Sequence, residues 1–124
     1  MIPAPFNYRA KIVRVVDGDT VIMEIDLGFH VTANVSVRLL GVDAAESYRG
    51  TPSERERGHY AKTFVESWVY RNARTPEVKL EWPFVLSSSK GDSFGRWLGR
   101  VWAVASGEEL SQVLLDSGHG TPLA

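Results

Sequence analysis

Alternating apolar and polar positions mark the first forty residues of the chain. Residues 8–16 are rich in β-branched side chains, and residues 20–26 and 31–39 follow with the same character. A period of two residues is typical of a strand with one buried face. Asp17-Gly18 and Leu27-Gly28 separate the three segments, and Asp-Gly is a strong hairpin-turn signal. The pattern predicts three consecutive strands joined by tight turns.

The third segment has the strictest alternation. Its apolar face holds Val31, Ala33, Val35, Val37 and Leu39. Its polar face holds Thr32, Asn34, Ser36 and Arg38. Arg38 is therefore expected to point away from the core and to be exposed.

A change of period follows the loop expected at residues 41–51. Pro52-Ser53-Glu54 is typical of a helix start, and residues 72–76 carry signals that end one. Between them, the stripe of an amphipathic helix is formed by Ala61, Phe64, Val65, Trp68 and Val69. The four tryptophans of the chain are interpreted as core or barrel-wall residues, and the three histidines as surface or capping residues.

Shorter patterns fill the rest of the chain. Residues 78–82 alternate as a strand, residues 83–93 resemble a polar loop, and residues 94–105 return to strand character. A last helix is expected at residues 108–117, with Gly118 as its C-terminal stop.

The order of these segments predicts the fold class. Three strands, a helix, two strands and a closing helix fit a mainly β, α+β protein. We expect an antiparallel, partly open five-stranded OB-fold Greek-key barrel, with a helix inserted after the third strand and a short C-terminal helix. The 124 residues fit a single domain, with a core from about residue 8 to residue 118.

Composition narrows the possible chemistry. The chain has no cysteine, which excludes thiolate metal sites, iron–sulfur clusters and thiol nucleophiles. Fourteen Lys and Arg against 15 Asp and Glu give a net charge of −1. Any binding of phosphate must then depend on a few placed arginines rather than on a broad positive field.

The first residues, Met1 to Tyr8, lack the basic region and apolar run of a signal peptide. No apolar stretch approaches the roughly 18 residues of a membrane span. The expectation is a cytoplasmic protein, a monomer, with no membrane partner.

Carboxylates and guanidiniums collect at predicted strand ends. The hairpin turn explains the presence of Asp17. Asp19 stands at a strand start, where Asp is disfavoured, and binding to a hard cation would explain its presence there. Asp43 and Glu46 follow the third strand, and Arg96 opens a later one. Taken together, these groups supply what phosphodiester hydrolysis requires, namely ligands for a divalent ion, a base, and guanidiniums for phosphate.

Three segments carry a resemblance to a known family. They are Val15-Val16-Asp17-Gly18-Asp19-Thr20-Val21, Val37-Arg38-Leu39-Leu40-Gly41-Val42-Asp43-Ala44-Ala45-Glu46, and Phe94-Gly95-Arg96. In this order and at this spacing, they resemble the signature segments of the staphylococcal nuclease (thermonuclease) family. The similarity covers roughly residues 11–118.

The resemblance implies a role for each matching position. Asp19, Asp43 and the backbone carbonyl of Ala44 would bind Ca²⁺. Glu46 would hold or deprotonate the attacking water, and Arg38 and Arg96 would bind the scissile phosphate. The implied activity is calcium-dependent hydrolysis of phosphodiester bonds in DNA or RNA, a nucleic acid substrate cut with little sequence specificity.

The chain also departs from the family pattern. Ala44-Ala45 stands where the family usually has Thr-Pro, and Ser93-Phe94 stands where many members have Lys-Tyr. We therefore expect this chain to bind nucleotides more weakly than family members that have Lys-Tyr there. The alternative is a non-catalytic OB-fold module that binds nucleic acid or another protein.

Overall fold

A computed structural model describes residues 6–74, 80–91 and 95–123. Its elements, in chain order, are β1 (Asn7–Asp17), β2 (Thr20–Asp26), β3 (Thr32–Leu39), β4 (Val42–Asp43), α1 (Pro52–Asn72), β5 (Phe84–Gly91), β6 (Trp97–Ala103), α2 (Leu110–Ser117) and β7 (Thr121–Pro122). β1, β2, β3, β6 and β5 form a closed barrel in that order, and β4 pairs with β7 beside it. The predicted OB-type fold, with a helix after the third strand and a short helix near the end, is confirmed.

Two features of the barrel differ from the sequence prediction. The barrel is closed rather than partly open, because β5 pairs with β1 as well as with β6. One pair, β3 with β6, is parallel rather than antiparallel. α1 and β5 intervene between these two strands in the chain, and a connection of that length can return the chain in the same direction.

The fourth barrel strand was misplaced by the sequence pattern. The segment predicted as a polar loop, residues 83–93, holds β5, whereas residues 80–82 form no strand and Val78 lies outside the described residues. Phe84 and Leu86 point into the core. The serines after them continue the ladder, since Ser87 and Ser88 pair with β6. Pairing on both sides outweighs the turn preference of a serine run.

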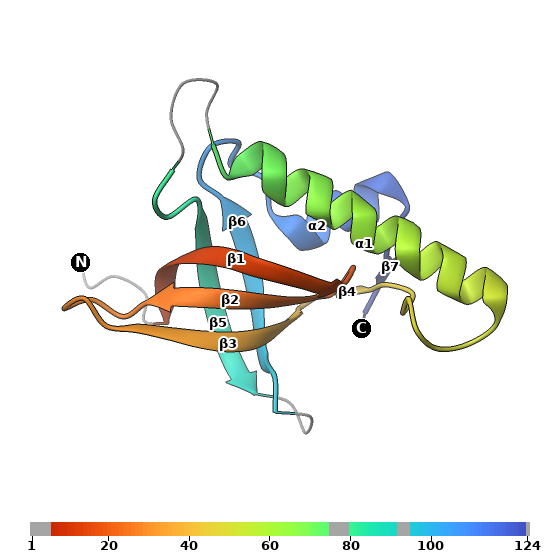
Figure 1. The fold of residues 1–124 in the computed structure, drawn as a ribbon, viewed down its shortest axis with the longest axis horizontal. Helices are drawn as coiled ribbons and strands as arrows, with labels where there is room; N and C mark the ends of the chain where they lie inside the picture. Colours follow the sequence, from red (N-terminus) through yellow and green to blue (C-terminus); the bar gives the residue numbers. More distant parts are fainter. Residues whose placement is uncertain (1–5, 75–79, 92–94, 124) are drawn as a thin grey trace.

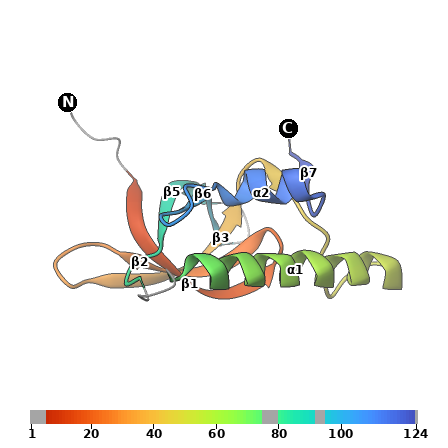
Figure 2. The same ribbon diagram turned by 90° about the horizontal axis from the view of Figure 1, so that it is seen from above.

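α1 packs against one side of the barrel from Gly58 onward, and its first turns extend past the barrel (Figures 1 and 2). Thr51 caps its first turn by accepting from the N–H of Glu54, and Pro52 occupies the first helical position. The buried face is Gly58, Ala61, Val65, Trp68 and Asn72, at spacings of three and four residues. Ala61, Val65 and Trp68 of the predicted stripe therefore face the barrel, and Phe64 and Val69 are half-buried beside them. Trp68 is a core residue as expected.

α2 closes the fold beside β4 and β7 (Figure 2). Leu110 and Leu114 are fully buried, and Ser111 Oγ donates to the carbonyl oxygen of Leu40 at 2.6 Å. Gly118 ends the helix in the left-handed conformation, with φ of 80°, as its position predicted. No helix in the described part of the chain is long and apolar enough to cross a membrane.

β2 is joined to β1 by a tight turn at one end and to β3 by a hairpin at its other end, so the two turns lie at opposite ends of the barrel strands (Figure 1). The backbone N–H of Gly28 donates to Asp26 and, with a smaller contribution from Arg9, holds the pKa of the Asp26 carboxyl below its usual value. Arg9 pairs with this carboxyl at 2.6 Å. The Gly28–Asp26 hydrogen bond and the backbone hydrogen bonds between Leu27, Gly28 and Val31 thus hold the hairpin turn, and the Arg9 ion pair ties β2 to β1.

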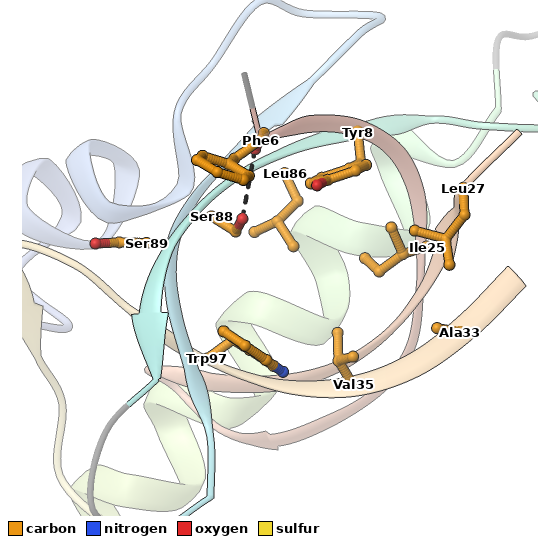
Figure 3. Close-up of a pocket in the computed structure, with 10 residues that line it drawn as sticks. All are labelled: Phe6, Tyr8, Ile25, Leu27, Ala33, Val35, Leu86, Ser88, Ser89 and Trp97. Atoms are coloured by element: carbon orange, nitrogen blue, oxygen red, sulfur yellow. Dashed lines mark hydrogen bonds between the residues drawn. The ribbon is translucent and has the colours of Figure 1, made fainter. Parts of the chain in front are cut away.

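An apolar pocket of about 620 Å³ opens at this end of the barrel. Figure 3 shows the rings of Phe6, Tyr8 and Trp97 around its mouth, with Ile25 and Val35 along its wall. Trp97 belongs to barrel strand β6, as expected of a barrel-wall residue, but it is 49% exposed at this end of the barrel. Among the described residues, none of the side chains that line it is charged.

Candidate functional site

The β1–β2 turn brings two carboxylates out of solvent. Asp17 pairs with Thr20, so the turn itself is Gly18-Asp19, one residue later than predicted. A Cβ on Gly18 would lie 2.9 Å from the Cβ atoms of Ala44 and of Ala61. Only glycine lets this turn pass under α1 at that distance.

Asp19 is 5% exposed, and each of its carboxylate oxygens has a partner. The backbone N–H of Ala44 donates to Oδ2 at 2.8 Å, and Thr20 Oγ1 donates to Oδ1 at 3.0 Å. Arg38 Nη2 lies 3.5 Å from Oδ2. A buried carboxylate needs such partners, and these fix the position of Asp19 relative to the chain after β3.

Arg38 links this carboxylate to the next strand. Its Nη1 donates to the carbonyl oxygens of Leu39 and Val42, at 3.0 and 2.8 Å. Its Nη2 donates to Asp43 Oδ1 at 3.0 Å. The side chain is 14% exposed, so the prediction that Arg38 is exposed is wrong. It does lie outside the barrel interior, but β4 and the β1–β2 turn cover it.

Asp43 is held at the mouth of the site by β4 and β7. Asp43 pairs with Thr121 and Val42 with Pro122. A Cβ on Gly120 would lie 2.4 Å from Val42 Cγ2, so this pairing needs a glycine. The Asp43 side chain is 58% exposed. Neither short strand was visible in the sequence, where residues 41–51 were expected to form a loop.

Asp19 Oδ2 and Asp43 Oδ1 therefore face the same nitrogen, Nη2 of Arg38. Two carboxylates already directed at one positive group can also face a hard cation, and oxygen donors suit Ca²⁺ or Mg²⁺. No group of three Asp, Glu or His side chains that could enclose a metal is present among the described residues. The residues thus fit a cation that completes its coordination with a backbone carbonyl, water and substrate oxygens.

Glu46 follows the site but does not join this network in the structure. Its side chain is 44% exposed, and Arg49 Nε lies 3.7 Å from its Oε2. The surrounding loop is nevertheless fixed, because the N–H and Oγ of Ser47 donate to Asp17 Oδ1 at 3.3 and 3.2 Å. Asp17 therefore anchors the loop that carries Glu46, a role that turn statistics alone did not reveal.

Gly58 of α1 also positions this loop. A Cβ at Gly58 would lie 2.3 Å from the carbonyl carbon and oxygen of Glu46. A glycine on the buried face of a helix costs roughly 1 kcal/mol of helix propensity relative to alanine. Its position here is explained by the need for the helix to touch the backbone of the Glu46 loop. The signal in the sequence was a lone glycine inside an otherwise regular helical stripe.

Arg96 lies just before β6 and is half-buried. In the β3–β6 pair, Trp97 aligns with Val37 and Leu98 with Arg38. Strand alternation, continued one residue before β6, puts Arg96 on the outer face that Leu98 and Arg38 share. The structure thus brings together Asp19, Arg38, Asp43 and Ala44, with Arg96 on the same face of the barrel and Glu46 on the adjoining loop. Phe94 and Ser93 lie outside the described residues.

Comparisons with known proteins support the resemblance found in the sequence. A family model for the staphylococcal nuclease homologue matches residues 36–122, more than half of the chain. The thermonuclease of Staphylococcus hyicus is 29% identical over 92 residues, which cover 74% of this chain. They cover 47% of that relative, so the chain matches about half of its length.

Arg38 is predicted to contribute to stability as well as to the site. Arg38→Ala should lower the free energy of unfolding by about 1–3 kcal/mol, because two carbonyl oxygens and a buried carboxylate lose their donor. Urea unfolding measures this change. Arg14→Ala, at an exposed position on β1, is the control and should stay within about 0.5 kcal/mol of the parent. Equal stability of the two variants would contradict this account of the Arg38 contacts.

Proposed function

The chain belongs to the staphylococcal nuclease homologue family, and we propose that it is a calcium-dependent nuclease that hydrolyses phosphodiester bonds in DNA or RNA. The observation that carries the proposal is the convergence of Asp19 Oδ2 and Asp43 Oδ1 on one guanidinium nitrogen. Carboxylates and a guanidinium in contact are the groups that a cation and a phosphate would use.

In this proposal Asp19, Asp43 and the carbonyl of Ala44 hold the cation. When bound, it supplies positive charge that screens the phosphate and favours the deprotonation of water. Asp19 suits the role because its position is fixed by the N–H of Ala44 and by Thr20. Asp43 suits it because its carboxylate is open to solvent and hence to substrate.

Glu46 is proposed to accept the proton of the attacking water. The water oxygen forms a bond to phosphorus, one P–O bond to a sugar oxygen breaks, and that oxygen takes up a proton from solvent, to which Glu46 later releases its own. Glu46 must first exchange its contact with Arg49 for the water. A separation of 3.7 Å between two largely exposed side chains makes this contact weak.

Arg38 and Arg96 are proposed to bind the phosphate oxygens and to stabilise the negative charge that develops on them. Arg38 already directs Nη2 toward Asp43 at the mouth of the site. A phosphate that arrives there would accept from the same nitrogen. Because contacts to phosphate carry no base information, little sequence specificity is expected.

The proposal treats residues 1–124 as one domain that acts as a monomer. Every residue with an assigned role comes from the barrel, β4 or the loop before α1, within one chain. The rival proposal is a non-catalytic binding module. The separation of Glu46 from the other candidate residues favours it, and the experiments below distinguish the two.

Cleavage is expected to depend on a divalent cation. A labelled single-stranded DNA should be cut in millimolar Ca²⁺ and left intact in excess EDTA, because the carboxylates alone cannot screen the phosphate. Gel electrophoresis of the products measures this. Undiminished cleavage in EDTA would refute the mechanism, and binding without cleavage in any divalent cation would support the non-catalytic alternative.

Asp43→Asn and Glu46→Gln should fail in different ways. Asp43→Asn should weaken Ca²⁺ binding itself, since it removes a charged ligand. Glu46→Gln should largely retain Ca²⁺ binding but lose turnover, since it removes the base. Calorimetric titration with Ca²⁺, alongside steady-state kinetics, separates the two effects. Equal loss of Ca²⁺ affinity in both variants would contradict the division of roles.

Arg96→Ala is expected to lower kcat by roughly 10²-fold or more, the scale for removing one transition-state donor. Arg96→Lys serves as the matched variant, because it keeps the charge and loses the forked donor geometry. It should lie between the parent and Arg96→Ala. A rise in KM at unchanged kcat would instead assign Arg96 to ground-state binding of the substrate.

A further inference from the structure

α1 carries a second stripe along one edge of its buried face. Arg57, Tyr60, Phe64, Ser67 and Arg71 recur at spacings of three and four residues, so they share one face of the helix. At a rise of 1.5 Å per residue, the stripe is about 21 Å long from Arg57 to Arg71. Tyr60 is 60% exposed. This long row of arginines and rings is exposed except at Phe64, so packing against the barrel does not explain it.

This stripe lines a groove that begins at the candidate site. A hollow of about 360 Å³ is bounded by Asp43 and Ala44 at one end, by Arg57 and Tyr60 on α1, and by His119 and Thr121. A second hollow of about 700 Å³ continues past Phe64, Tyr70 and Arg71. Tyr60 and His119 line both hollows. We call the two together the α1 groove.

The groove has rings at fixed positions. His119 stacks on Phe64, with ring centroids 4.6 Å apart. The backbone N–H of His119 donates to the carbonyl of Leu114, which ties the main chain of His119 to the end of α2. Tyr60 Oη donates to Glu56 Oε1 at 3.2 Å, so the hydroxyl is engaged while the ring stays exposed. Rings held in this way can stack on a base at little cost in side-chain entropy.

The groove also has cations available for an anion. Within the described ranges, Arg57 and Arg71 have no carboxylate within ion-pair distance. Glu66 also lines the groove and opposes an anion there. Asp43 lines the groove too but is paired with Arg38 at 3.0 Å. This leaves Glu66 against the two arginines, and Arg57 stands on the side of the proposed phosphate site.

We propose that the α1 groove binds the single-stranded nucleic acid that flanks the scissile phosphate, with Arg57 on a neighbouring phosphate and Tyr60 stacked on an unpaired base. The inference rests on the proposed function and extends it by naming the path of the strand. A single strand fits because stacking on a side chain needs a base that is not already stacked and paired in a duplex. The continuity of the groove with Asp43 fixes where the strand enters the site.

Binding without cleavage tests the inference independently of catalysis. Fluorescence anisotropy in EDTA measures the affinity of labelled single-stranded oligonucleotides of increasing length. Tyr60→Ala should weaken binding of the longer oligonucleotides about ten-fold, the scale of one lost base–aromatic stack. Arg57→Gln should reduce the slope of log affinity against log salt by about 0.7, the value for one phosphate contact on a single strand. A dinucleotide too short to reach the groove should bind the parent and both variants equally.

Two matched variants separate the groove from general effects. Arg55→Gln removes the same charge from the other side of α1, and it should leave affinity and salt slope close to those of the parent. Tyr60→Phe keeps the ring and loses the contact with Glu56, and it should bind much more like the parent than like Tyr60→Ala. Arg57→Gln equal to Arg55→Gln, or Tyr60→Phe as weak as Tyr60→Ala, would overturn the inference.

The substrate form gives a further check. A duplex of the same sequence should bind less tightly than the single strand and should not respond to Tyr60→Ala. Duplex binding as tight as single-strand binding would refute the inference. If the parent binds through the groove but cuts nothing in Ca²⁺, the groove stands and the proposed nuclease activity fails. If the parent cuts DNA but both groove variants bind like the parent, the proposed nuclease activity stands and the inference about the groove fails.

Discussion

A guanidinium that is largely shielded from solvent must find several acceptors, and Arg38 finds them on both sides of the turn between β3 and β4. Two are backbone carbonyls, which fix the course of that turn, and two are the carboxylates of Asp19 and Asp43. The position of β4, and through it the pairing with β7, follows from these contacts. Because the same guanidinium is proposed to bind phosphate, the groups that hold the site together are the groups that would act in it. Such overlap is the usual source of conflict between stability and activity.

α1 imposes a second constraint on the site, because its close contacts with the barrel and the Glu46 loop require glycines, which have no side chain. Gly58 lets the helix touch the backbone of Glu46, and Gly18 lets the β1–β2 turn pass beneath Ala61. The barrel, the helix and the loop of Glu46 are therefore in direct backbone contact. The second stripe of the same helix lines the α1 groove, so one rigid element sets the position of the loop and of the groove. A site built on a helix is held more tightly than one built on loops alone.

The sequence predicted well what depends on local periodicity or on co-ordered motifs. The three N-terminal strands, the stripe on α1 and the turn at Gly118 follow from spacing, and the three family segments identified the candidate residues. The predictions that failed concern features that depend on pairing between distant parts of the chain. The serines of β5 become strand only because β1 and β6 flank them, and β4 exists only because β7 reaches it. The prediction that Arg38 is exposed failed for the same reason, because alternation predicts the side of a strand on which a residue lies but not what covers that side.

The structure also shows where the charges of this nearly neutral chain lie. A net charge of −1 gives no long-range attraction for a polyanion, so binding must be local. Several acidic residues are already neutralised by contacts within the fold, as Asp26 is by Arg9 and Glu109 by Arg100. Arg57 and Arg71, by contrast, have no carboxylate partner in the described ranges and stand along one groove. The arrangement therefore provides local positive charge along the α1 groove, next to Asp43, without a basic protein overall. A strand would then be drawn to the molecule only at short range, where rings and arginines act together.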